Sequence, residues 1–229
     1  MTIFRYALLR SIRSPLTLIV NCILPPALMF IRPLWLEQQG LGLSFVAFII
    51  MSGAYLMSQI ILKDKAEGAI HRILAAPVTM RRYLAENLLA CMVPLLAQMV
   101  LISLLGWVLY GWDATLAVAV FLCYTVLTLT SVTMSFAWHC LVKSKENSTM
   151  GFSFILTFMA LLGGLFFPTT VFPGPLQYIG AIFPIYWAME GLRSVQELGT
   201  MSAQFWLAIA AMLFFAAAYL LYGGKRRII

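Results

Sequence analysis

A charged segment from Lys63 to Arg82, KDKAEGAIHRILAAPVTMRR, holds the side chains best suited to contact another molecule. It is the one long charged run in a chain of 229 residues that is 62% hydrophobic, and apolar runs lie on both sides of it. Glu67, His71 and Arg72 would offer a carboxylate, an imidazole and a guanidinium from one short helix. Connections between packed helices are usually about two to eight residues long. The longer segment here therefore predicts a docking helix for another protein.

The pattern within this segment predicts a short helix, a turn and then the start of a membrane helix. Pro77 ends the first helix, because proline lacks an N–H donor and pushes the preceding residue out of the helical region. Thr79 is a good N-cap for the next helix, where Arg82 and Glu86 are four residues apart and can pair. An interfacial helix that only places its charges among lipid headgroups is the alternative interpretation. The apolar face of the first helix comprises Ala66, Ala69, Ile70, Ile73 and Leu74.

The sequence lacks the motifs that would indicate catalysis. It contains no GxxxxGK[ST] phosphate loop, no GxSxG and no HExxH. The two histidines, His71 and His139, are far apart, and the four cysteines fall inside apolar runs at irregular spacing, which favours packing over metal ligation. We therefore expect no catalytic site, no metal site and no cofactor bound by this chain. If the chain moves a solute uphill, the energy must come from a partner.

The composition is typical of a protein that crosses a membrane several times. Only 10% of the residues are charged, whereas soluble domains carry about 25%, and the mean hydropathy is +0.95. A spanning helix needs about 20 mostly apolar residues. We therefore expect an all-α membrane protein in which residues 1–229 form a single domain with six transmembrane helices. The predicted spans are Leu16–Leu36, Leu41–Leu62, Leu84–Tyr110, Thr115–Val142, Thr149–Phe167 and Phe205–Tyr222.

The distribution of lysine and arginine predicts the orientation of these spans. Thirteen of the fifteen basic residues precede the first span, follow the sixth, or lie in the connections after the second and fourth. Only Arg32 and Arg193 fall on the other side. The positive-inside rule then places both termini in the cytoplasm. The net charge of +7 is explained by this topology, so no nucleic-acid partner is expected.

The first fifteen residues have the pattern of a basic amphipathic helix. Arg5, Arg10 and Arg13 lie off the apolar face, which predicts an interfacial helix over residues 1–15. A juxtamembrane flank that only sets topology accounts for the same residues equally well. The apolar face comprises Phe4, Ala7, Leu8 and Ile12.

Residues 168–198 predict short helices instead of a further span. Prolines divide this stretch into apolar pieces whose length is typical of re-entrant or interfacial segments. Glu190 and Arg193 are three residues apart and can pair on the last of these helices. A static outer cap held by aromatic side chains is the alternative. The prolines are Pro168, Pro173, Pro175 and Pro184.

The charged segment resembles the cytoplasmic loop of permeases of ABC exporters of the second exporter class, a family of drug, antibiotic, lipid and polysaccharide exporters. The family pattern is an acidic residue and glycine, a basic residue with two aliphatic residues, a proline, and then the third span. The similarity extends over nearly the whole chain, from the N-terminal segment to the region before the last span. One departure is Ala69, where the family often has Thr or Ser. The matching residues are Glu67-Gly68, Arg72-Ile73-Leu74, Pro77 and Tyr83-Leu84-Ala85-Glu86.

The resemblance implies a role for each of these elements. Residues 63–77 would be the coupling helix that contacts an ABC ATPase subunit, and that subunit would bind ATP and Mg²⁺. Residues 1–15 would lie at the inner membrane surface, and residues 168–198 would form two re-entrant helices that cap the exit. The chain would lie among lipids in a bacterial inner membrane, paired with an identical or related permease. The coupling residues would be Glu67, Gly68, His71, Arg72 and Pro77.

Two permease halves meet mainly through spans two and five in that family, so side chains on these spans are candidates for the pathway. Methionine and aromatic side chains make adaptable apolar surfaces that suit amphiphilic cargo. Ordinary packing against lipid or neighbouring helices is the alternative for each residue. The candidates are Met51, Tyr55 and Gln59 on span two, and Phe158, Met159, Phe166 and Phe167 on span five.

We therefore expect the permease subunit of an ATP-driven exporter of an amphiphilic antibiotic, drug or peptide. An exporter of polysaccharide or lipid-linked glycan is one alternative, and a non-transporting membrane scaffold that recruits a cytoplasmic protein is another. A membrane enzyme that acts on lipids is disfavoured, because the sequence shows no polar catalytic cluster at a membrane face.

Overall fold

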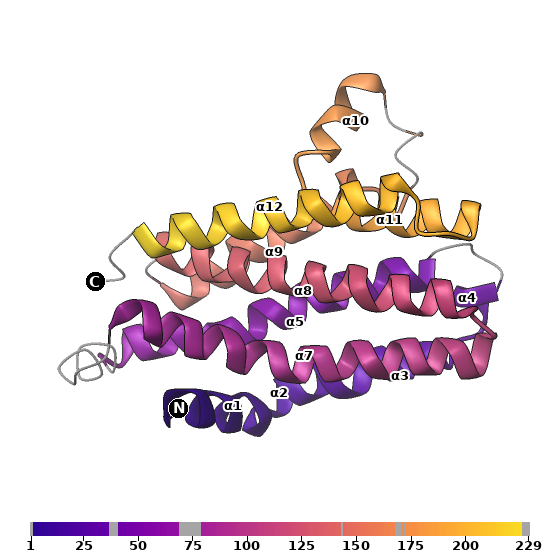
Figure 1. Cartoon of the computed structure of the whole chain (residues 1–229). Helices are drawn as coiled ribbons and strands as arrows, with labels where there is room; N and C mark the ends of the chain where they lie inside the picture. Colours follow the sequence, from indigo (N-terminus) through magenta and orange to yellow (C-terminus); the bar gives the residue numbers. More distant parts are fainter. Residues whose placement is uncertain are drawn as a thin grey trace.

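The computed structural model describes residues 2–36, 41–68, 79–142, 144–167, 171 and 173–225. All regular secondary structure in these ranges is helical, which confirms the predicted all-α class. The long helices run side by side as an elongated bundle (Figure 1). In chain order the elements are α1 (Thr2–Arg13), α2 (Pro15–Leu18), the π-helix η1 (Ile19–Ile23), α3 (Leu24–Met29), α4 (Pro33–Leu36), α5 (Leu41–Ala66), α7 (Met80–Tyr110), α8 (Ala114–Leu141), α9 (Lys145–Leu162), α10 (Gly174–Gly180), α11 (Pro184–Leu198) and α12 (Ala203–Lys225).

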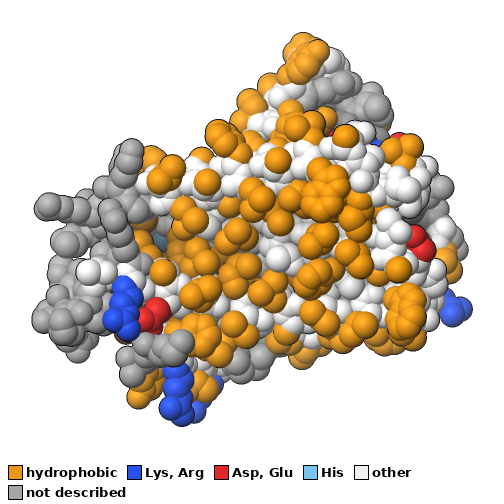
Figure 2. Space-filling view, viewed as in Figure 1, with side chains coloured by type: hydrophobic (Ala, Val, Ile, Leu, Met, Phe, Trp, Pro, Cys, Tyr) orange, Lys and Arg blue, Asp and Glu red, His pale blue; other side chains and the backbone are white. Residues whose placement is uncertain are grey.

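Four helices within the described residues are long and apolar enough to cross a membrane. They match the second, third, fourth and sixth predicted spans, and a fifth candidate arises if the bent segment from α1 to α3 counts as one span. On the face shown in Figure 2, hydrophobic side chains cover the middle of the molecule, and the visible charged side chains lie toward its two ends. This distribution fits a multi-pass membrane protein, while the count of six spans stays a prediction. The four segments are Leu41–Asp64, Arg82–Tyr110, Ala114–Leu141 and Ala203–Gly223.

The first predicted span, Leu16–Leu36, is broken in the structure. Its helical part ends at Met29, and a separate short helix, α4, begins at Pro33. Pro25 and Pro26 have no N–H groups to complete the helical hydrogen bonds, and the backbone widens into the π-helix η1 just before them. The helix nevertheless continues through both prolines and is interrupted only at residues 30–32, directly before Pro33, which disfavours the helical conformation of the residue preceding it.

The fifth predicted span, Thr149–Phe167, is displaced toward the N-terminus as α9. Ser144 caps the helix, with its Oγ accepting a hydrogen bond of 3.2 Å from the backbone N–H of Asn147. The helix ends at Leu162, before the helix-disfavouring pair Gly163 and Gly164. The Phe166 and Phe167 pair consequently lies beyond the helix, in the segment that leads toward α10.

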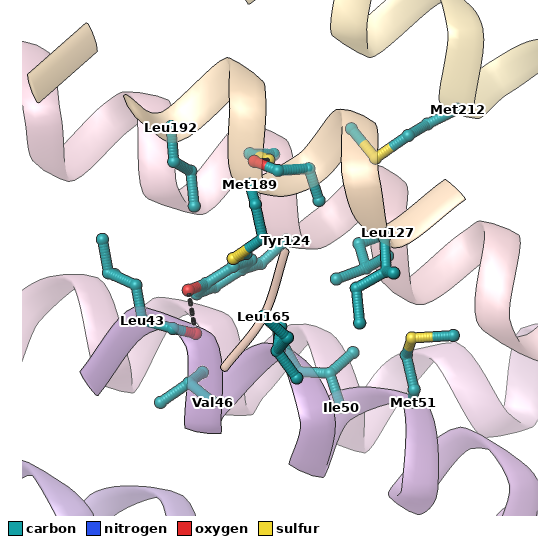
Figure 3. Close-up of a cluster of buried hydrophobic side chains, with 14 of the residues drawn as sticks. Leu43, Val46, Ile50, Met51, Tyr124, Leu127, Leu165, Met189, Leu192 and Met212 are labelled. Carbon is teal, nitrogen blue, oxygen red and sulfur yellow. Dashed lines mark hydrogen bonds between the residues drawn. The ribbon is translucent and has the colours of Figure 1, made fainter. Parts of the chain in front are cut away.

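Helix α8 lies at the centre of the bundle, where it packs against α5, α7, α11 and α12. Figure 3 shows how Tyr124 of α8 reaches α5, where its hydroxyl donates a hydrogen bond of 2.7 Å to the carbonyl of Leu43. Thr130 likewise donates to the carbonyl of Met212 on α12, at 3.0 Å. These bonds join buried apolar helices, whose association in a membrane depends on close packing and interhelical hydrogen bonds.

Two short helices occupy the region in which the sequence predicts them. Helix α10 projects from the bundle, which it contacts at α9, and its Tyr178 is 81% exposed, whereas α11 lies along α12 and packs against α8 (Figure 1). The predicted pair of Glu190 and Arg193 forms on α11, with Nη1 of Arg193 3.3 Å from Oε2 of Glu190. The short helices are thus present, while their re-entrant placement in a membrane stays a prediction.

Candidate functional site

An ion pair attaches helix α1 to the bundle at the end where α5 ends and α7 begins. Nη2 of Arg10 lies 2.8 Å from Oδ1 of Asp64 and also donates a hydrogen bond of 3.0 Å to the carbonyl of Ile60. The hydroxyl of Tyr83, on α7, donates to Oδ2 of the same aspartate at 2.6 Å. The Asp64 side chain is only 9% exposed. A buried carboxylate needs such partners, and here they tie three helices together.

Glu86 of α7 makes a second attachment of α1. Its Oε2 accepts a hydrogen bond of 3.0 Å from the backbone N–H of Phe4, and its Oε1 lies 2.9 Å from Nε of Arg82. The predicted Arg82–Glu86 pair is therefore confirmed. Thr79 also caps α7 as predicted, since its Oγ1 accepts from the backbone N–H of Arg82 at 3.4 Å. We call this end of the bundle, which carries α1 and the start of α7, the α1 end.

The predicted coupling segment starts inside helix α5. Residues 63–66 continue that helix, and Glu67 follows as an exposed side chain whose carboxylate lies 3.7 Å from Nζ of Lys63. Gly68 then turns the chain with φ of 65°, a conformation that glycine adopts without steric cost. The remaining coupling residues predicted from the sequence, His71, Arg72 and Pro77, lie outside the described residues.

The three arginines predicted for the N-terminal helix do not share one environment. Arg5 and Arg13 are exposed on α1, whereas Arg10 is bound to Asp64. The segment Ile3–Arg10 is bent by 78° from Pro15–Met29, so α1 lies nearly perpendicular to the helices that follow it. This angle is the one expected of a helix lying on a membrane surface beside a spanning segment.

The pathway candidates Tyr55 and Gln59 face the start of α9. The hydroxyl of Tyr55 lies 3.2 Å from the hydroxyls of both Ser148 and Thr149 and can donate its one proton to either, and Nε2 of Gln59 lies 3.5 Å from Oγ1 of Thr149. The ring of Tyr55 also stacks on Phe152, with 4.1 Å between the ring centroids. Spans two and five therefore contact each other within one chain, and these residues hold that contact.

A buried histidine completes this contact. His139 of α8 lies with Nε2 2.8 Å from the hydroxyl of Ser58 and with Nδ1 3.4 Å from the hydroxyl of Ser148. All three side chains are buried. The resulting network joins α5, α8 and α9 near the α1 end, and its polar groups have the partners that burial requires.

The other pathway candidates divide into buried and exposed side chains. Met51 and Met159 belong to the hydrophobic core, so in this conformation they pack against their own chain. Phe158 and Phe167 are 47% and 52% exposed. Phe166 packs against the rings of two phenylalanines of α5 and, with Phe167, borders a cavity of about 710 Å³ between α5 and α11. The structure thus separates five residues that the sequence grouped together as pathway candidates.

Sequence reasoning missed two residues at the α1 end. It assigned no function to Asp64, one of the charged residues of the segment Lys63–Arg82, or to Tyr83, although these side chains form the attachment site of α1. A lone aspartate at the end of a long apolar helix is the signal that would have found the site, because such a carboxylate requires a cation or donors nearby. His139 was set aside because of its distance from His71.

The described residues contain no group of three or more His, Cys, Asp or Glu side chains that could hold a metal ion. What this end of the bundle offers is a set of contacts between helices beside an exposed charged turn. Such an arrangement can transmit a mechanical load between a loop and membrane helices.

Comparison with known proteins assigns the chain to a family. The family model described as ABC-2 family transporter protein matches residues 35–224, which is most of the chain. No curated protein matches the sequence. The matched range includes all four long apolar helices, from α5 to α12. The chain therefore belongs to the ABC-2 family of transporter proteins, as a multi-pass membrane component of an ABC transporter.

Proposed function

We propose that this chain is the permease subunit of an ATP-driven exporter that moves an amphiphilic antibiotic, drug or peptide out of a bacterial cell. Two copies, or one copy and a related permease, would form the pathway in the inner membrane with both termini in the cytoplasm. Separate ATPase subunits would dock at the α1 end and bind ATP and Mg²⁺. Binding of ATP would draw these subunits together and favour the outward-open state of a two-state permease.

The observation that supports this proposal is the continuity of α5 from the buried core to the charged turn. The helix carries Met51 and Tyr55 in its buried part and ends at Ala66, directly before Glu67. A displacement of that turn would act on a rigid helix, and the Asp64–Arg10 pair would carry it to α1. Membership in the ABC-2 family supports an ABC ATPase subunit as the partner, because a permease without its own ATPase site depends on a separate subunit to hydrolyse ATP.

The aromatic and methionine side chains of α9 support the choice of cargo class. Met150, Phe154 and Phe158 are exposed at every fourth position, and the last two rings stack with 6.4 Å between their centroids. Such a surface is adaptable and apolar, as amphiphilic cargo requires. A glycan cargo would instead select for polar groups that bond hydroxyls along a continuous channel.

The substitution Glu67→Lys tests the docking assignment. It reverses an exposed charge, so we expect normal membrane insertion and normal copurification of a folded permease. We also expect loss of transport-coupled ATP hydrolysis, measured with the partner ATPase in proteoliposomes. Glu146→Lys is the matched control, because Glu146 is an exposed carboxylate at the start of α9 and makes the same charge change.

Normal coupling in Glu67→Lys would remove Glu67 from the docking surface. Copurification of the wild-type chain in mild detergent tests the broader proposal. An ATP-hydrolysing partner whose activity rises with an amphiphilic compound supports export of that class. Stimulation by a lipid-linked glycan alone would favour the glycan exporter, and reproducible absence of any ATPase would favour a scaffold.

A further inference from the structure

Helix α1 does not lie flush against the bundle. A cavity of about 630 Å³ separates part of it from α5 and α7, and a second of about 200 Å³ continues between the α1–α2 junction and α5. Arg10 and Ile60 border both cavities. The two spaces therefore form one groove that follows α1 and α2, which we call the α1 groove.

The walls of the α1 groove are mainly apolar near the start of α1. Ile3, Tyr6 and Leu9 line it from α1, and Ile60 lines it from α5. Tyr6 is 72% exposed, so the groove opens outward between this side chain and the bundle. A hydrocarbon chain placed there would remain in contact with apolar side chains along its length.

The other side of the α1 groove carries positive charge. Arg10 is compensated by Asp64, and Lys63 is compensated by Glu67. Arg13 also lines the groove, is exposed, and forms no ion pair with any residue that the structure describes. Arg10 is 41% exposed and still has N–H groups that can donate to a further anion. The charge that remains uncompensated in the groove is therefore positive.

The position of the groove specifies what can reach it. It lies where the apolar segment of α5 ends at Asp64 and that of α7 begins at Arg82, which is the level of a membrane surface. At this level a lipid presents its phosphate to arginine while its acyl chain extends along apolar walls. A soluble anion would gain no binding free energy from the apolar walls, and a neutral hydrocarbon would gain none from Arg13.

We propose that the α1 groove binds one anionic phospholipid, with the phosphate at Arg13 and Arg10 and an acyl chain along Ile3 and Leu9. The bound lipid fills the space between α1 and α5 and adds a lipid-dependent contact to the Arg10–Asp64 attachment. A zwitterionic lipid binds less tightly, because its cationic headgroup opposes the two guanidinium groups.

Native mass spectrometry of the purified full-length protein tests this proposal. Phosphatidylglycerol and phosphatidylcholine with identical acyl chains serve as the two probes. We expect phosphatidylglycerol to bind about fivefold more tightly at one saturable site, which is the effect of roughly one basic residue at an anionic membrane surface. Glycerol phosphate, which has the anion without the chains, should not compete at equal concentration.

Two variants distinguish lipid binding in the α1 groove from a general attraction between a basic helix and anionic lipid. Arg13→Gln removes the uncompensated cation and should abolish the preference for phosphatidylglycerol. Arg5→Gln removes the same charge from an exposed position of α1 that lines neither cavity, and it should keep the preference. Both positions are exposed, so both variants should melt at the wild-type temperature.

Three results would overturn the proposal. Equal loss of preference in Arg13→Gln and Arg5→Gln would show diffuse electrostatic attraction. Equal binding of the two lipids to the wild-type protein would show filling by hydrocarbon alone. Displacement by glycerol phosphate would show a free anion site without a role for the acyl chain.

Discussion

Asp64 of α5 and Arg10 of α1 form an ion pair of 2.8 Å in which the carboxylate is buried and the guanidinium reaches solvent. Tyr83 of α7 donates to the same carboxylate at 2.6 Å, so one aspartate is shared by three helices. Through this contact the N-terminal helix is attached where α5 leads into the charged turn. The relationship makes α1 part of the region that we expect to receive force from the ATPase.

Replacing Asp64 with Asn should loosen α1. The variant loses the ion pair and weakens the bond from Tyr83, with a cost of about 1–2 kcal/mol after allowance for the partly solvated Arg10. We expect the Tm in detergent to fall by a few degrees for each kcal/mol lost. Protease cleavage near α1 should also accelerate. The Lys63–Glu67 pair supplies the control, because both side chains are exposed and Glu67→Gln should leave the Tm unchanged.

The substitution Tyr55→Phe tests the contact between α5 and α9. It keeps the ring stacked on Phe152 but removes the hydroxyl that lies within hydrogen-bond distance of Ser148 and Thr149. We expect a loss of about 0.5–1.5 kcal/mol, since each bond is neutral and lies between membrane helices. Tyr178→Phe is the matched control on the exposed α10. Identical melting curves for wild type and Tyr55→Phe would show that these bonds add nothing to stability.

Gly53 of α5 is so closely packed that a methyl group added at this position should overpack the surrounding core. A Cβ at this position would lie 1.9 Å from Oδ1 of the buried Asn21, whose Nδ2 is held by the carbonyl of Thr17 at 2.9 Å. Gly53→Ala should therefore destabilise the protein by about 1–3 kcal/mol. Thermal melting and yield after detergent extraction measure the effect.

A second substitution checks the cause of this destabilisation. Asn21→Ala removes the clashing side chain, so the double variant should recover part of the stability that Gly53→Ala loses. Gly174→Ala is the control for a glycine with open space around its Cβ position, and it should melt like the wild type. Strictly additive losses in the double variant would contradict a clash between these two residues.

Labelling of introduced cysteines tests the predicted orientation of the membrane spans. In a background in which the four native cysteines are replaced, Thr200→Cys should react with a membrane-impermeant maleimide on intact cells. Glu146→Cys should react only after the cells are permeabilised. Thr200 follows α11 and Glu146 starts α9, and both residues are exposed. The opposite labelling pattern would invert the proposed topology.

The elements that depend on local chemistry could be predicted from the amino-acid sequence alone. Helices α5, α7, α8 and α12 were predicted close to their observed bounds, because the length of an apolar run decides whether it can cross a membrane. The Thr79 cap and the Arg82–Glu86 pair were also predicted, since their partners lie within one turn of helix.

Which distant side chains meet depends on how the helices pack, and this could not be predicted from the sequence. In the sequence Asp64 is one charge among several in the segment Lys63–Arg82, whereas packing buries it against α1 and α7. His139 seemed isolated until α5 and α9 brought Ser58 and Ser148 to its two ring nitrogens. A buried polar group obtains its partners from whichever helices pack around it, and that arrangement depends on the whole bundle, not on neighbours in the sequence.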